Sequence, residues 1–300
     1  MKKLSIIGTV AYDSIKSPHG ERERILGGSA SFSSIAASLF NESHIVSIVG
    51  QDFESKYLDF FNERGINTTG IEIADGNTFH WSGYYEKDMA EAFTLQTDLN
   101  VLLAFNPVVP EHCKDSGIVF CANIDPVLQK QAIEQFQNPE LVILDTMNFW
   151  IEHSKDALLE VLKLVDILIV NDGEARQLTG ESNIVNALDA LIQLGPKRVI
   201  VKKGEHGSIM YDGISHFTCP ALPIRNLIDP TGAGDSFAGA FAGYLSSSNS
   251  RTEQDFRKAV AFGSIVSAHT VQGFSFDALN KLTLPAVHEQ LLAIHNLSSI

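Results

Sequence analysis

Short apolar runs alternate with amphipathic stretches along most of the 300-residue chain. The runs lack strict alternation of apolar and polar residues, which is typical of strands buried on both faces of a parallel sheet. Such strands are predicted over residues 4–10, 44–50, 116–122, 140–145, 165–170 and 198–203. Helices are predicted between them over residues 31–40, 53–64, 126–136, 154–165 and 182–194. Repeated strand–helix units predict an α/β fold, a three-layer αβα sandwich around a doubly wound, mostly parallel sheet, with ligands beyond the carboxyl ends of its strands.

One region breaks this rhythm. Residues 78–105 contain no long amphipathic pattern and alternate like antiparallel strands, so that Phe79, Trp81 and Gly83 share one face. A second polar strand is predicted over residues 13–25. Together the two segments predict a small β-sheet that forms a lid over the strand ends.

Composition and charge narrow the partners. The chain is 44% hydrophobic and has no repeat or linker, so we expect a single domain over residues 1–300. Its net charge is −14, from 22 Lys+Arg against 36 Asp+Glu, and the dense basic groups are only the pairs Lys2-Lys3 and Lys202-Lys203. We therefore expect neither nucleic acid nor a membrane as a partner, whereas a small phosphorylated ligand held by backbone groups is compatible with this charge.

The three cysteines favour a cytoplasmic protein. Cys113, Cys121 and Cys219 are odd in number and share no metal-type spacing, so they are interpreted as reduced thiols.

The densest candidate chemistry lies in residues 229–237, DPTGAGDSF. Pro230 suits a turn ahead of a helix, and glycines at 232 and 234 allow unusual backbone conformations and close approach of a ligand. The amides of Gly232, Ala233 and Gly234 are expected to point outward at the N-terminus of the following apolar helix, where anions are attracted. This stretch predicts an anion hole for a migrating phosphoryl group.

Asp235 lies in the first turn of the same helix. A lone aspartate there is ordinarily a capping or helix-dipole residue. Beside an anion hole it can instead act as a general base toward an attacking hydroxyl, and a weak base suffices when the transition state is loose. The coincidence of turn, glycines, helix start and acid favours the catalytic interpretation. No GxxxxGK[ST] loop, dinucleotide fingerprint or protein-kinase motif competes with it.

The stretch DPTGAGDSFAGAF resembles the C-terminal signature of the ribokinase-like (pfkB) family of small-molecule kinases, and the similarity extends over essentially the whole chain. Gly27-Gly28 followed by SIAASLF resembles the family's N-terminal signature. The segment Asn171 to Glu174 matches its N-x-x-E motif, and VKKGEHG (201–207) matches the strand and turn that lie along the nucleotide. The resemblance implies ATP and Mg²⁺ as cofactors.

The resemblance also implies roles on the nucleotide side. Glu174 is expected to help organise Mg²⁺, through water, and Asn171 to contact a phosphate oxygen. Gly204 and Gly207 permit the turn along the nucleotide. A lysine at 202 or 203 either adds a point charge there or belongs to a solvated pair at the strand end.

A monovalent cation is a further implied cofactor. Asp229 and Thr231 align with positions that bind a monovalent cation, such as K⁺, in some family members. A turn-forming aspartate and a capping threonine are the alternative.

On the acceptor side, Asp13 matches the family aspartate that accepts hydrogen bonds from substrate hydroxyls, and Gly28 and Asn123 fall at further substrate positions. The chain departs from the family at Phe32, where the signature often carries a sugar-binding asparagine. The ring argues against ribose bound in the usual way. With the aromatic lid residues it is compatible with a flatter acceptor such as a nucleoside, but packing of these rings in the lid sheet or a dimer interface is slightly favoured. The lid aromatics are Phe79, Trp81, Tyr84 and Tyr85.

The hypothesis from sequence is an ATP-dependent kinase that transfers the γ-phosphoryl group to a hydroxyl of a sugar or sugar derivative. The alternatives are a nucleoside kinase on the same scaffold and a catalytically silent metabolite-binding protein. Exposed lid strands also predict a homodimer through the lid.

Overall fold

Apolar strands form a central sheet in the computed structural model, which describes residues 1–298. Within that part of the chain the sheet has nine strands: seven pair in parallel, and β12 and β13 add antiparallel pairings at one edge. In sheet order the strands are β13 (His216–Cys219), β12 (Ser208–Tyr211), β11 (Arg198–Lys202), β10 (Ile167–Asn171), β9 (Leu141–Asp145), β8 (Ile118–Cys121), β1 (Leu4–Ile7), β4 (Ser43–Gly50) and β5 (Ile66–Ala74). The predicted, mostly parallel sheet is confirmed.

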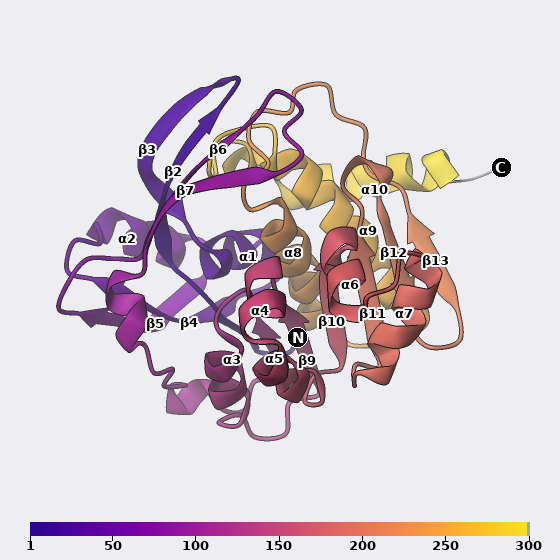
Figure 1. Ribbon diagram of the computed structural model, residues 1–300, viewed down its shortest axis with the longest axis horizontal. Coiled ribbons are helices and arrows are strands. Elements are labelled where there is room, and N and C mark those ends of the chain that lie inside the picture. Colours follow the sequence, from indigo (N-terminus) through magenta and orange to yellow (C-terminus); the bar gives the residue numbers. More distant parts are fainter. Residues whose placement is uncertain (299–300) are drawn as a thin grey trace.

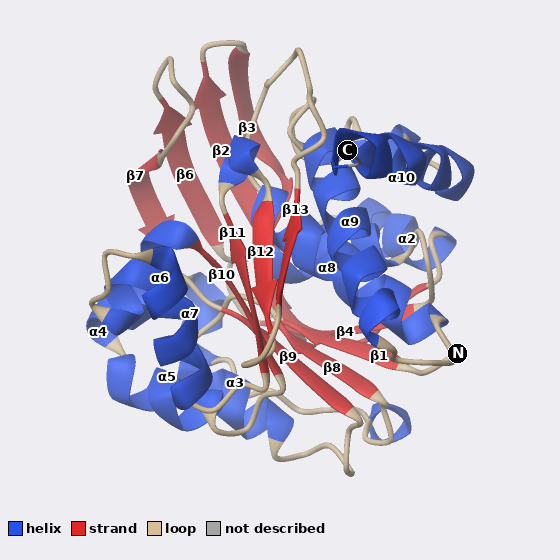
Figure 2. Cartoon of the chain, turned by 90° about the vertical axis from the view of Figure 1, so that its right-hand side faces the viewer, coloured by secondary structure: helices blue, strands red, loops and turns tan. Residues whose placement is uncertain are grey.

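Helices cover both faces of this sheet (Figure 2). One face packs against α1 (Ser29–Ala37), α2 (Ser55–Glu63), α8 (Ala233–Ser247), α9 (Glu253–Thr270) and α10 (Leu284–Ser298). The other packs against α3 (Pro126–Ile133), α4 (Asn148–His153), α5 (Lys155–Leu162), α6 (Asp172–Thr179) and α7 (Ile184–Gln193). The three layers follow from the two separate apolar cores. No helix of the described residues is long and apolar enough to cross a membrane.

Strands β5, β12 and β13 are absent from the prediction. Strands β5 and β13 are the two edge strands of the sheet, and β12 is a buried strand of four residues next to β13. Strand β5 is largely polar and partly exposed, and β13 is only partly buried. Neither therefore produces the apolar run by which a central strand is identified.

A second, four-stranded sheet projects from the body within the described chain (Figure 1). Its strands, in order, are β3 (Gly20–Gly27), β2 (Ala11–Ser17), β6 (His80–Tyr85) and β7 (Ala92–Asp98). The single strand predicted over residues 13–25 is wrong: the segment is an antiparallel hairpin, β2–β3, that turns at Pro18 and His19. The turn chemistry of Pro18 and Gly20, whose φ is +144°, explains the reversal.

The face of this small sheet is set by its register. Strands β2 and β6 pair in parallel, with Asp13 beside Trp81. Side chains alternate along a strand, so Tyr85 lies on the same face as Asp13 and Trp81. The Trp81 ring covers Gly83, where a Cβ would lie 2.4 Å from the ring, and this confirms their predicted common face.

Candidate active site

The turn before α8 brings glycines and a carboxylate to the start of a helix. Gly232 has φ +75°, a left-handed conformation that suits glycine, and α8 begins at the next residue. The Ala233 amide donates to the Pro230 carbonyl at 3.2 Å. The amides of Gly232 and Gly234 have no hydrogen-bond partner in the described part of the chain. These two donors at the positive end of the helix dipole can bind an anion.

Phe32 lies beneath this turn. Its ring is 1% exposed and packs on Phe276 at a centroid distance of 4.4 Å. A Cβ at Gly232 would lie 2.3 Å from the Phe32 ring, so the ring supports the turn from below. Contact between Phe32 and the acceptor stays a prediction.

Asp235 lies in the first turn of α8, close to another carboxylate. Desolvation and the repulsion of Asp145 raise its pKa to about 7, although Lys202 opposes this shift. A carboxyl group with a pKa near 7 can exchange a proton at neutral pH, which is the requirement for a general base.

Lys202, at the carboxyl end of β11, is the cation of this cluster. Its ammonium group lies 3.5 Å from Oδ1 of Asp145, at the end of the neighbouring-but-one strand β9. Burial lowers the pKa of Lys202, but Asp145, Glu174 and Asp235 raise it more, so the net shift is upward and the side chain stays charged. Of the two lysines left open by the sequence, Lys202 is thus the one in the cluster.

Asp145 is the residue that sequence reasoning missed. It is 4% exposed, and burial raises its pKa, opposed by Lys202. Its Oδ1 makes no hydrogen bond within the described residues and has only the ion pair with Lys202. The available signal was its place as the acid that ends the apolar run ELVILD.

Asn171 and Glu174 form a capping box at the start of α6. The Asn171 side chain accepts from the Glu174 amide, and Glu174 Oε2 accepts from the Asn171 amide, both at 2.8 Å. Burial raises the pKa of Glu174 to about 7; Asp145 adds to the shift and Lys202 opposes it. The box fixes Glu174 beside the cluster and leaves its second oxygen, Oε1, without a role in the cap.

Asp13 approaches the same region from the small sheet. It is 5% exposed, and burial, followed by repulsion from Asp229 and Asp235, raises its pKa to about 7. The Gly28 amide donates to its carboxylate. A Cβ at Gly27 would lie 1.9 Å from Asp13 Oδ2, so the glycine pair makes room for the carboxylate.

Asn123 is held by its neighbours. Its Oδ1 accepts from the Trp150 indole at 2.9 Å, and its amide nitrogen lies 3.1 Å from the Met147 sulfur. These contacts tie the end of β8 to α4.

Asp229 and Thr231 precede the glycine turn. The Thr231 amide donates to Asp229 Oδ1 at 3.0 Å, and the Thr231 hydroxyl lies 3.0 Å from the Tyr85 hydroxyl of the small sheet. Asp229 is 0% exposed, and its Oδ2 has no hydrogen-bond partner among residues 1–298. Burial raises the pKa of Asp229.

Gly204 and Gly207 shape the turn after β11. Their φ angles are +54° and +80°, and a Cβ at Gly207 would lie 2.1 Å from the Cys219 carbonyl oxygen. The Lys203 amide donates to the Gly207 carbonyl at 2.8 Å, which closes the turn. No contact joins these glycines to the carboxylate cluster in the described chain.

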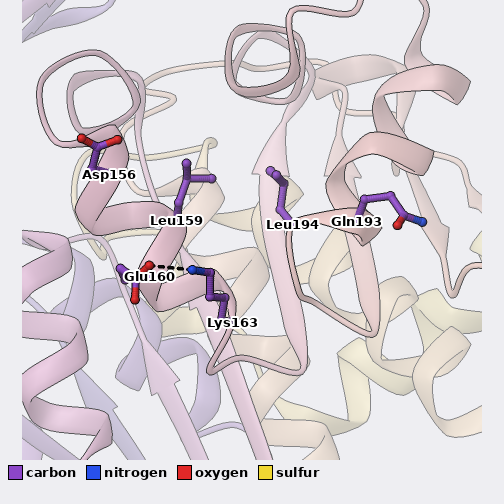
Figure 3. Close-up of a pocket in the computed structure, with 6 residues that line it drawn as sticks. All are labelled: Asp156, Leu159, Glu160, Lys163, Gln193 and Leu194. Carbon is purple, nitrogen blue, oxygen red and sulfur yellow. Dashed lines mark hydrogen bonds and ion pairs between the residues drawn. The ribbon is translucent and has the colours of Figure 1, made fainter.

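A separate hollow lies away from this chemistry. It measures about 420 Å³ and lies between α5 and α7, where Glu160 and Lys163 form an ion pair of 2.6 Å (Figure 3). Its lining is Asp156, Leu159, Glu160, Lys163, Gln193 and Leu194. None of the clustered carboxylates contributes to it, so it has no part in the site.

Similarity to known proteins extends over most of the chain. The family described as pfkB family carbohydrate kinase matches residues 1–280. A cytidine kinase from Thermococcus kodakarensis is 30% identical over 250 residues, which cover 81% of this chain and 89% of the relative.

Two solved structures share the fold. The nucleoside kinase of Methanocaldococcus jannaschii has a TM-score of 0.78 and 21% identity, over 98% of this chain and 99% of its own. An Escherichia coli protein provisionally designated ribokinase II, solved with ATP and Mg²⁺, has a TM-score of 0.81 and 19% identity, over 98% and 99%.

Proposed function

Because the chain belongs to the pfkB family of carbohydrate kinases, it is an ATP-dependent phosphotransferase with an alcohol as acceptor, and we propose that Asp235 takes the proton from the attacking hydroxyl. The observation that carries this proposal is the pKa of about 7 for a carboxyl group in the first turn of α8, next to free amides. The proposed base directly follows the Gly234 amide in the chain. Transfer of a phosphoryl group to a hydroxyl needs a base and an anion site close together.

On the phosphate side, the amides of Gly232 and Gly234 are proposed to bind the migrating phosphoryl group, with the Ala233 amide aligned behind them. Lys202 Nζ would lie 2.8 Å from a Cβ at Gly234, so its charge is next to the same position. A buried cation there stabilises negative charge that develops on the phosphoryl oxygens. Asn171, Gly204 and Gly207 are proposed to flank the nucleotide.

The residues fit Mg²⁺, which the family uses with ATP. Asp145 and Glu174 are hard oxygen donors, and Asp145 Oδ1 is a buried atom without a hydrogen bond in the described chain. Bound Mg²⁺ neutralises charge on the phosphate oxygens. Glu174 is proposed to hold the ion through water. When the ion is absent, the positive charge of Lys202 offsets the mutual repulsion of Asp145, Glu174 and Asp235.

On the acceptor side, Asp13 is proposed to accept hydrogen bonds from hydroxyls of a sugar. Its carboxylate is buried, faces the cluster from the small sheet and has the Gly28 amide as a fixed partner. A desolvated carboxylate binds paired hydroxyl donors more strongly than it does in water. Gly28 and Asn123 are proposed to line the same site, and the small sheet to close it as a lid that excludes water.

A nucleoside is the second candidate acceptor. The observation that favours it is the 30% identity to a cytidine kinase over most of both chains. Trp81 and Tyr85 lie on the face of the small sheet that carries Asp13, and aromatic rings can stack on a base.

The test is a coupled ADP-release assay with ribose and cytidine as a matched pair, because both carry the same sugar. Further pentoses, hexoses, sugar acids and nucleosides extend the panel. Turnover of free sugars supports the first candidate, and turnover of nucleosides alone supports the second. No ADP release above that of Asp235→Asn, with any of these acceptors, would contradict both.

We also propose that Asp229 and Thr231 help bind a monovalent cation such as K⁺. The supporting observation is the buried Asp229 Oδ2 that lacks a hydrogen-bond partner among the described residues. Activation by K⁺ over tetramethylammonium in the wild-type protein, and its loss in Asp229→Asn, is expected. Equal rates in both salts would contradict the cation site.

A homodimer through the small sheet is proposed because β7 is an edge strand with Phe93 and Leu95 exposed by 39% and 65%. Sedimentation of the wild type and Leu95→Lys tests it, and a monomeric wild type would contradict it. We place the enzyme in the cytoplasm, where ATP is available and the three unpaired cysteines stay reduced.

A further inference from the structure

A cluster of nitrogen and sulfur donors lies at the amino ends of the strands, far from the carboxyl ends that carry the active site. His44, His112 and Cys113 each offer one ligand atom, and these atoms all lie within 4.8 Å of one another. His44 is the second residue of β4 and pairs with Ser5 of β1. Strands β1 and β4 lie side by side in Figure 2. The other two residues end the short 3₁₀ helix Glu111–Cys113.

The sheet presents His44 in a row of polar residues. Ser5 on β1 is its neighbour on one side, and Asn67 on β5 is its neighbour on the other. Adjacent residues of parallel strands point to the same face. The Asn67 side chain lies beside His44, whereas His44 Nδ1 is buried without a hydrogen-bond partner in the described chain. An orientated imidazole with one free nitrogen is the usual state of a metal-binding histidine.

The turn carries the other two donors over this row. Cys113 is 1% exposed, and the Ser5 hydroxyl hydrogen-bonds the Ser116 hydroxyl at 2.8 Å in the same turn. The Cys113 amide is fixed to the Pro110 carbonyl at 2.8 Å. His112 is exposed, and its Nε2 lies 3.4 Å from the Thr69 hydroxyl. The cluster thus joins one solvent-exposed imidazole to a buried sulfur.

We propose that His44, His112 and Cys113 bind one Zn²⁺-type divalent cation, with water as the fourth ligand. Mixed imidazole and thiolate donors select zinc over magnesium or calcium. Donors around tetrahedral zinc are separated by about 3.3–3.8 Å, so closing the site needs shifts of only about 1 Å. The cysteines show no metal-type spacing in the sequence because the donors come from two segments, residue 44 and residues 112–113.

Binding exchanges a proton for the metal. The Cys113 thiol loses its proton to solvent, the sulfur–metal bond forms with the freed electron pair, and one water leaves the hydrated ion for each protein donor. Both histidines bind the ion in the neutral form. The bound ion would tie the 110–116 turn to the strand row.

The test uses the full chain, treated with a chelator and titrated with Co²⁺ without nucleotide or Mg²⁺. The wild type is expected to bind one Co²⁺ saturably, with the near-ultraviolet charge-transfer absorption of a thiolate ligand. Cys113→Ser should abolish that absorption, and His112→Ala should weaken binding by at least roughly tenfold. Zn²⁺ should raise the Tm of the wild type and not of these variants.

Matched controls separate this site from other thiols and histidines. Cys219→Ser removes another buried thiol, and His216→Ala removes another exposed imidazole. Both are expected to bind Co²⁺ like the wild type. Kinase activity serves as the folding check for each variant. Absence of the charge-transfer absorption in the wild type, its persistence in Cys113→Ser, or unchanged affinity in His112→Ala would overturn the proposal.

Discussion

Lys202 Nζ forms its ion pair with Asp145 Oδ1, 3.5 Å away, directly behind the backbone of Gly234. Two strands and a helix start meet at this point, because β9, β11 and the first turn of α8 each contribute one of the three residues. A side chain at 234 would displace the ammonium group. The glycine thus provides space for a buried cation in addition to its backbone freedom.

Removing the Lys202 cation should slow phosphoryl transfer and change the pH dependence of the enzyme. We expect Lys202→Met to reduce kcat/KM by about 10²–10³, because charge on the phosphoryl group loses its stabilisation. Without the lysine the pKa of Asp235 should rise further, since Lys202 now lowers it. The acid limb of the pH–rate profile should therefore move to higher pH. Lys203→Met is the matched control, and an equal loss in both variants would refute the assignment to Lys202.

Replacing the proposed base should abolish turnover without unfolding the protein. Asp235→Asn is expected to lower kcat by at least roughly 10²–10⁴, the range of general-base catalysis. The control is Asp156→Asn, which neutralises an exposed first-turn aspartate of α5. In the wild type, kcat/KM should fall about tenfold per pH unit below about 7, because desolvation sets the pKa of Asp235 there. Near-normal turnover of Asp235→Asn would exclude it as the base.

Neutralising Asp13 should stabilise the unliganded protein. Burial raises the pKa of Asp13 to about 7, so the native state keeps a proton that the unfolded chain loses near pH 4. Stability therefore falls as pH rises between about 4 and 7. Asp13→Asn should remove this loss and raise the free energy of unfolding at pH 8 by roughly 1–3 kcal/mol, while turnover decreases. Denaturant unfolding at about pH 4.5 and about pH 8 measures the free energy of unfolding of both proteins. A variant less stable than the wild type at pH 8 would show that the ionised Asp13 carboxylate does not destabilise the native protein.

The contact between the small sheet and the glycine turn can be tested with two adjacent tyrosines. Tyr85→Phe removes the hydrogen bond to Thr231, which is expected to contribute about 0.5–1.5 kcal/mol. We expect the KM of the acceptor to rise by roughly two- to tenfold with little change in Tm. Tyr84→Phe is the control, because Tyr84 stacks on Phe93 on the opposite face. Equal KM values for the two variants would contradict a role for this contact.

The sequence predicted the parallel sheet and the glycine turn because each is specified locally. A buried strand is an apolar run, and a turn before a helix is a short motif. Edge strand β5 was missed because solvent permits polar residues there. The hairpin β2–β3 was missed because its strands are polar and joined by only two turn residues.

The candidate site was predictable only in part for the same reason. Asp235 and Glu174 belong to motifs, whereas Asp145 becomes significant only when β9 and β11 bring it to Lys202. Alternation along β11 did not decide between Lys202 and Lys203. Phe32 was noticed as a departure from the N-terminal signature, but only the packed structure places its ring under Gly232.

The three-residue link between β1 and β2, residues 8–10, joins the two sheets and has a mechanical consequence. Asp13 lies on strand β2 of the small sheet, whereas Asp235 lies in α8, which packs in the body. Any rotation about that link changes the separation of the two carboxylates directly. The proposed substrate-binding carboxylate, Asp13, and the proposed base, Asp235, thus lie on two different parts of the molecule. A small sheet rotated away from the body would therefore hold Asp13 too far from Asp235 for a bound hydroxyl to reach the base.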